Sequence, residues 1–134
     1  MKDVKGIQIE KLNFELQKAG DIYSFEGPLL SHFKDGQGNN YIMSWVDLDW
    51  ETANRWTLFK VSEGDLNRYF STDVTLKKLI YKAEPIYVID ISSDGEYLKL
   101  WIVDIEDLPD DYLPDDDSKF DLDFADEYAL KFIK

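Results

Sequence analysis

The stretch RWTLFKVSEGDL, residues 55–66, contains the change of period that decides the fold. Arg55–Val61 is rich in β-branched and aromatic residues, which is typical of a strand. Ser62 and Asp65 then have the positions of a capping box, in which the serine hydroxyl accepts a hydrogen bond from the first helical turn. Apolar residues at helical spacing follow, so we expect a short helix that ends at about Phe70.

A second helix is expected to begin after Thr75. Val74 and Leu79 occupy the positions of a hydrophobic staple around this N-cap residue. Pro85 should end the helix, because proline lacks the backbone N–H that a helix interior needs.

Two hairpins are predicted on either side of these helices. Residues 35–40 form a loop rich in residues that tolerate positive φ, and a strand follows over Tyr41–Val46. Asp47–Asn54 should then be a polar connection to the next strand. Pro85–Ile91 and Tyr97–Ile105 are β-branched and aromatic runs that flank an Asp-Gly turn, so they predict the second hairpin.

The N-terminal third fits more than one pattern. Ile7–Leu16 has both helical and strand spacing, and we assign it to a strand. Lys18–Asp21 predicts a turn. Along Ile22–Phe33, apolar side chains fall on one face at period two. Gly27-Pro28 interrupts that run as a bulge or an edge, because proline removes a donor from the strand ladder.

Runs of strands and helices that do not alternate one by one indicate an α+β fold. We expect an antiparallel sheet of about five to six strands, with two short helices inserted after the third main strand and packed on one face. The chain has 134 residues, which fits one α+β core domain over residues 1–105. Residues 106–134 form an acidic aromatic C-terminal segment that we expect to dock on the core.

The composition excludes several classes of protein. The chain has no cysteine, so disulfides, thiolate zinc sites and cysteine nucleophiles are impossible. No apolar run approaches the roughly 20 residues needed to cross a bilayer, and the first residues lack the apolar region of a signal peptide. We therefore expect a cytoplasmic protein that does not bind membranes.

The negative charge is concentrated near the C-terminus. Residues 104–127 hold twelve acidic side chains and one basic side chain, so they carry eleven of the thirteen net negative charges. Such a field disfavours nucleic-acid phosphates and anionic membranes and favours basic partners. The alternative is that these acids only maintain solubility.

Aromatic residues are interleaved with these acids, and such a surface can clamp a basic protein partner. Aromatic side chains supply buried anchors, and carboxylates steer the encounter and pair with Arg or Lys. The alternative is a solubilising tail whose aromatic side chains pack on the protein's own sheet. The predicted partner-binding residues are Trp50, Asp110, Asp111, Tyr112, Asp115, Asp116, Asp117, Phe120, Asp121, Asp123 and Phe124.

Catalytic patterns are weak in this chain, and we predict no enzyme. His32, the single histidine, is expected at a strand surface or edge. A lone histidine acts as a general base only when a nucleophile and an orienting group converge on it. Asp47, Asp49 and Glu51 could perform glycosidase-type acid and base work, but a solvated loop is the preferred interpretation.

No metal or cofactor site is predicted. A calcium loop of EF-hand type that begins at Asp115 would place Lys119 at a ligand position and Phe120 where glycine is needed. The template therefore fails. Phosphate-cradling glycine loops, nucleophilic serine elbows and zinc-binding helix motifs are also missing from the sequence.

Five stretches within residues 23–80 form a further pattern: YSFEGPLL from Tyr23, YIMSWVD from Tyr41, RWTLFKV from Arg55, SEGDL from Ser62 and TLKKL from Thr75. They resemble a family of small, uncharacterised bacterial proteins. That family shares a tyrosine-rich strand that ends in Gly-Pro, a strand with a tryptophan, an Arg-Trp strand and two helices that begin with Ser or Thr. The resemblance implies a bacterial, intracellular α+β module and nothing catalytic.

The leading hypothesis is a non-enzymatic interaction module that binds a basic partner, as an immunity, antitoxin or defence-linked component would. A second hypothesis is a nucleic-acid mimic that blocks a DNA- or RNA-binding enzyme, since spaced carboxylates can imitate a phosphate backbone. A third is a hydrolase that uses Asp47, Asp49 or Glu51 with His32.

Overall fold

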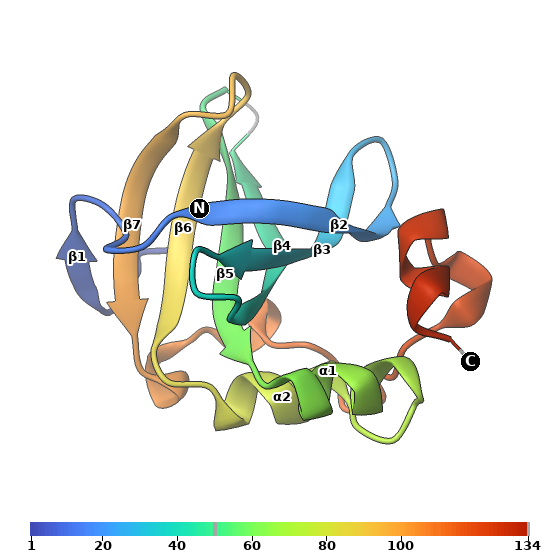
Figure 1. The fold of residues 1–134 in the computed structure, drawn as a ribbon. Coiled ribbons are helices and arrows are strands. Elements are labelled where there is room, and N and C mark those ends of the chain that lie inside the picture. Colours follow the sequence, from blue (N-terminus) through green and yellow to red (C-terminus); the bar gives the residue numbers. More distant parts are fainter. Residues whose placement is uncertain (50, 134) are drawn as a thin grey trace.

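The computed structural model describes residues 1–49 and 51–133, which form a curved antiparallel sheet with helices against it (Figure 1). Within these residues seven strands follow the order β1-β7-β6-β5-β4-β3-β2, so the first two strands lie at opposite edges. The strands are β1 Ile7–Ile9, β2 Leu16–Ser24, β3 Pro28–Asp35, β4 Asn40–Asp49, β5 Ala53–Val61, β6 Ile86–Ser92 and β7 Tyr97–Val103.

The α+β class and the antiparallel sheet are confirmed, and the strand count and helix position are corrected. The sheet has seven strands rather than five or six, and the helices follow the fifth strand rather than the third. The difference arises in the N-terminal third. Residues 7–16 contain β1 and the first residue of β2, and residues 22–33 are divided between β2 and β3.

Both predicted helices begin at the predicted caps. The first, α1, spans Glu63–Phe70, and the Ser62 hydroxyl accepts a hydrogen bond from the Asp65 backbone N–H at 3.0 Å. The second, α2, spans Leu76–Lys82, and the Thr75 hydroxyl accepts a bond of 3.1 Å from its first turn. Each helix buries an apolar face in the main core against the sheet.

Both faces of the sheet are buried. On one face the main core includes Ile22, Phe59 and Val88, together with apolar side chains of both helices. On the other face the chain between β1 and β2 crosses the sheet, and Phe14 stacks on Tyr41 with ring centroids 5.0 Å apart. In Figure 1, β2 passes in front of β5 and β6, which shows how strongly the sheet curls.

Two expectations for the N-terminal third are wrong. The predicted turn at residues 18–21 lies inside β2, where the register with β3 shifts between Lys18 and Gly20. Glycine is required at this position because a Cβ on Gly20 would lie 2.2 Å from the Tyr128 ring. The Gly27-Pro28 break is a hairpin turn between β2 and β3 rather than a bulge within one strand.

The described part of the C-terminal segment, residues 106–133, packs into the main core. Its short 3-10 helices are η1 Ile105–Asp107, η2 Asp110–Tyr112, η3 Leu122–Phe124 and η4 Glu127–Phe132. Its buried core side chains are Leu108, Tyr112, Phe120 and Ala129. Between η2 and η3, the Ser118 carbonyl accepts a bond of 2.8 Å from the Leu76 N–H, so this segment also completes the start of α2.

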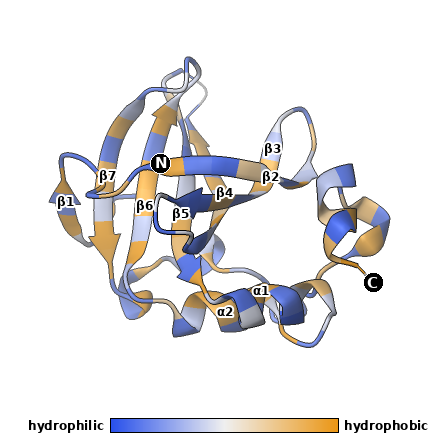
Figure 2. Ribbon diagram, in the orientation of Figure 1, coloured by the Kyte–Doolittle hydropathy of each residue, from blue (hydrophilic) through white to orange (hydrophobic). Residues whose placement is uncertain are grey.

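Hydrophobic residues predominate along β6, and the C-terminal segment mixes hydrophobic and hydrophilic residues (Figure 2). Leu122, Phe124, Leu130 and Ile133 of this segment are large, apolar and exposed. None of the described helices is long and apolar enough to cross a membrane.

Candidate functional site

An apolar groove of about 470 Å³ lies between the β2–β3 turn and η3, and we call it the Phe25–Phe124 groove. Phe25 is 75% exposed and Phe124 is 74% exposed. The β2–β3 hairpin, α1, α2 and residues 118–124 all contribute to its lining. Contiguous exposed apolar patches mark binding surfaces in soluble proteins, so the groove is the candidate site.

The β2–β3 turn holds Phe25 outward. The backbone N–H of Phe25 donates to the Gly27 carbonyl at 2.8 Å. Gly27 has φ 132°, a conformation that glycine adopts readily. Glu26 has φ 54°, and the left-handed conformation costs a residue with a side chain about 1–2 kcal/mol. Backbone strain of this kind is concentrated at binding and catalytic sites.

Aromatic side chains form the floor of the groove. The hydroxyls of Tyr23 and Tyr69 lie 3.4 Å apart. Phe120 lies behind both rings, stacked on Tyr23 at 6.0 Å and edge-on to Tyr69 at 5.7 Å. The Tyr23 hydroxyl also accepts a hydrogen bond of 2.6 Å from the Asp121 backbone N–H. These contacts hold Asp121 at the edge of the aromatic floor.

Acidic groups outnumber basic groups around the groove. Asp121 lines it, Glu26 is exposed in the adjoining turn, and Asp126 accepts a bond of 2.6 Å from the hydroxyl of Ser24, which also lines the groove. Lys119 is the one basic side chain in the described lining, and it is exposed. The groove therefore favours a cationic ligand over an anionic one.

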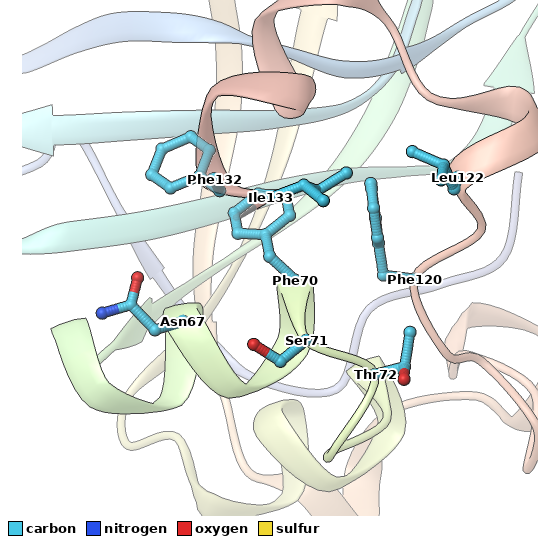
Figure 3. Close-up of a pocket in the computed structure, with 8 residues that line it drawn as sticks. All are labelled: Asn67, Phe70, Ser71, Thr72, Phe120, Leu122, Phe132 and Ile133. Carbon is cyan, nitrogen blue, oxygen red and sulfur yellow. The ribbon is translucent and has the colours of Figure 1, made fainter.

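Residues 118–124 also contribute Phe120 and Leu122 to a second cavity, of about 510 Å³, beside the end of α1 (Figure 3). Phe70 and Phe132 stack there with ring centroids 4.3 Å apart. Asn67 and Ser71 contribute polar side chains from α1 and its C-cap. The described residues that line this cavity are uncharged, so it lacks the charge preference of the Phe25–Phe124 groove.

Among the predicted partner-binding residues at the groove, some are exposed and one is buried. Asp121 and Phe124 line the groove, and the Asp123 backbone N–H donates to the Asp121 carboxylate at 3.0 Å. Phe120, in contrast, is 5% exposed. It supports the groove from the core and does not present a surface anchor.

The other predicted acidic residues do not line the groove. Asp110 and Asp111 are exposed at η2, and Asp111 pairs with Lys2 at 2.8 Å. Asp115–Asp117 are exposed beside α2, where Asp116 forms an ion pair with a lysine of that helix. Trp50 lies outside the described residues.

Tyr112 belongs to a buried ionic network that fixes the C-terminal segment to the sheet. Arg55 donates two hydrogen bonds to Asp90, of 2.7 and 2.9 Å, and both residues are 4% exposed. Arg55 also donates to the Tyr112 hydroxyl at 3.2 Å and to the Lys2 carbonyl at 2.6 Å. Tyr112 in turn donates to Asp47. Burial would lower the pKa of Arg55, but its hydrogen bonds to Asp90 and Tyr112 raise it above the usual value.

His32 is buried, which corrects the prediction of a surface or edge histidine. The residue is 1% exposed. Nε2–H donates to Oδ1 of Asn40 at 2.8 Å, and Nδ1 accepts from the Tyr128 hydroxyl at 2.8 Å. Burial lowers the pKa of His32, although the hydrogen bond to Asn40 opposes this change. The strand face that carries His32 is covered by η4, a segment far away in the sequence.

The acidic residues considered for hydrolysis do not converge on His32. His32 pairs with Ile42 on β4, and Asp47 lies five residues further along that strand. At the usual rise per residue the two are separated by about 17 Å. The Asp49 carboxylate accepts a bond of 3.1 Å from the Glu51 N–H. Among the described residues, no three acidic or histidine side chains are placed to hold a metal ion.

Tyr23, Phe25 and Leu29 are the groove residues that sequence reasoning missed. Their period-two spacing groups them on one strand face, whereas the structure places them on both sides of a turn. The available signal was Gly27-Pro28, because a Gly-Pro dipeptide is typical of a turn.

Comparison of the chain with protein-family models, curated protein sequences and solved structures finds no match. The function is therefore inferred from geometry and charge. Of the two cavities, the Phe25–Phe124 groove combines exposed aromatic side chains with a charged edge.

Proposed function

We propose that this protein is a non-enzymatic acidic interaction module that binds a basic protein partner through the Phe25–Phe124 groove. The observation that carries the proposal is the presence of two highly exposed phenylalanines and an acidic edge at one site. Aromatic anchors with complementary charge around them are typical of the energetic centres of protein interfaces. A bacterial immunity, antitoxin or defence component that neutralises a basic partner would use such a surface.

The charge of the whole chain favours a basic partner over the other occupants. The net charge is −13, so two copies that meet at this face would bring like charges together. Nucleic-acid phosphates would be repelled for the same reason. The exposed acids of residues 110–117 do not line the groove, and they contribute longer-range steering, which salt weakens.

Capture from extracts of the source cells tests the proposal. The full chain serves as bait beside a groove variant, Phe25→Ser with Phe124→Ser, and a control, Leu98→Ser. Leu98 is 47% exposed on β7, away from the groove, so the control removes an exposed apolar side chain elsewhere.

We expect one basic protein that the wild type and the control capture, that salt releases, and that the groove variant loses. Capture of the same protein by the groove variant at equal strength would contradict the assignment of the groove. An acidic partner would contradict the assignment of charge.

A further inference from the structure

We propose that the Phe25–Phe124 groove receives an arginine side chain of the partner, held against aromatic rings and paired with Asp121. The inference rests on the proposed function and names the contact that would give it specificity. It follows from the aromatic rings and the carboxylate that line the groove.

Four aromatic side chains line the groove: Tyr23, Phe25, Tyr69 and Phe124. The face of an aromatic ring attracts a cation within about 6 Å, and the attraction increases when the cation loses its water. Leu29, Leu30 and Leu76 add aliphatic surface beside the rings, so a side chain that enters the groove loses part of its water there. The protein already uses this contact internally, since the Arg55 guanidinium lies 5.2 Å from the Trp101 ring.

Asp121 supplies a fixed counter-charge at the edge of these rings. Its backbone N–H is bonded to the Tyr23 hydroxyl, and its carboxylate accepts a bond of 3.0 Å from the Asp123 N–H. A carboxylate held in this way can accept two parallel hydrogen bonds from a guanidinium group. Arginine fits better than lysine, because the guanidinium is planar, stacks on aromatic rings and is weakly hydrated.

Lys119 allows the preference of the groove for a positive charge to be tested. Its side chain is exposed and lines the groove, so its charge opposes the entry of a cation. Asp121→Asn should therefore weaken the binding of arginine, and Lys119→Gln should strengthen it. Opposite responses of two neighbouring charges distinguish electrostatic recognition from a general loss of structure, which would weaken binding in both variants.

The experiment is an NMR titration of the full chain with two short peptides. Each is a capped glycine peptide with one central residue, arginine in the first and citrulline, its uncharged isostere, in the second. We expect the arginine peptide to shift the aromatic resonances of Phe25 and Phe124 and to bind about tenfold more tightly than the citrulline peptide. The variant Phe25→Leu with Phe124→Leu keeps apolar volume but removes rings, and it should lose this discrimination.

Equal binding of the two peptides would overturn the inference and leave an apolar docking groove. The absence of shifts at millimolar arginine peptide would also overturn it. Neither result decides the proposed function, because that proposal fails by a separate observation, namely retention of the partner by the serine variant of the groove.

Discussion

A chain that ends at Asp104 should not fold, because the residues beyond it fill the main core. Leu108, Tyr112 and Phe120 are at most 5% exposed. Removal of a buried leucine side chain costs about 2–5 kcal/mol and of a buried aromatic side chain about 3–5 kcal/mol. The three together amount to about 8–15 kcal/mol, which matches the whole stability of a typical domain, about 5–15 kcal/mol. The truncation also removes the Ser118 contacts to the start of α2.

Urea unfolding followed by circular dichroism, together with amide NMR spectra, provides the measurement. The full chain should unfold cooperatively, and the truncated chain should show no transition and poorly dispersed amide signals. Phe124→Ser is the matched control within the same segment, because this exposed side chain should change stability by less than about 0.5 kcal/mol. A truncated chain that unfolds cooperatively at the same urea concentration would refute the reasoning and show that residues 1–104 fold independently.

The remaining predictions concern the buried polar groups. Asp90→Asn should cost about 3–5 kcal/mol in the free energy of unfolding, because it leaves the Arg55 charge buried and unpaired. The double variant Arg55→Met, Asp90→Leu should cost less, and a larger loss in urea unfolding would contradict this account. His32 has a lowered pKa in the folded chain, so the unfolded chain takes up its proton first and stability should fall as the pH decreases below about 6.5. His32→Gln should flatten that decrease in the urea midpoint, and an unchanged slope would exclude His32 as its source.

Features set by a few neighbouring residues could be predicted from the sequence. The two helix starts depend on Ser62 and Thr75, whose hydroxyls bond to backbone groups three residues later. The hairpin at residues 35–40 depends on Asp35, which accepts bonds from the backbone of its own loop. In each case the stabilising contact is local, so the sequence pattern contains both partners.

Features set by distant residues could not be predicted. The strand through Gly20 and the burial of His32 both depend on Tyr128, about a hundred residues away in the chain. A short pattern around Gly20 is typical of a turn, and a lone histidine on a strand is typical of a surface position. Tertiary packing of η4 reverses both interpretations.

The candidate site shows the same limit. Phe120 and Phe124 occupy equivalent positions in an alternating stretch, and the sequence assigns both to partner binding. The structure separates them, because residues 122–124 form a 3-10 turn in place of an extended strand. Phe120 lies in the core, whereas Phe124 is exposed and lines the Phe25–Phe124 groove.

The sheet order has a consequence for synthesis on the ribosome. β1 pairs only with β7 among the described strands, and Ile7 lies opposite Ile102. The first strand must therefore wait while roughly 95 further residues are added, which takes about 5–20 s at the usual rate of about 5–20 residues per second. During this interval β1 is present without β7, its partner strand. Chaperones that recognise unpaired strands could therefore bind β1 on the nascent chain.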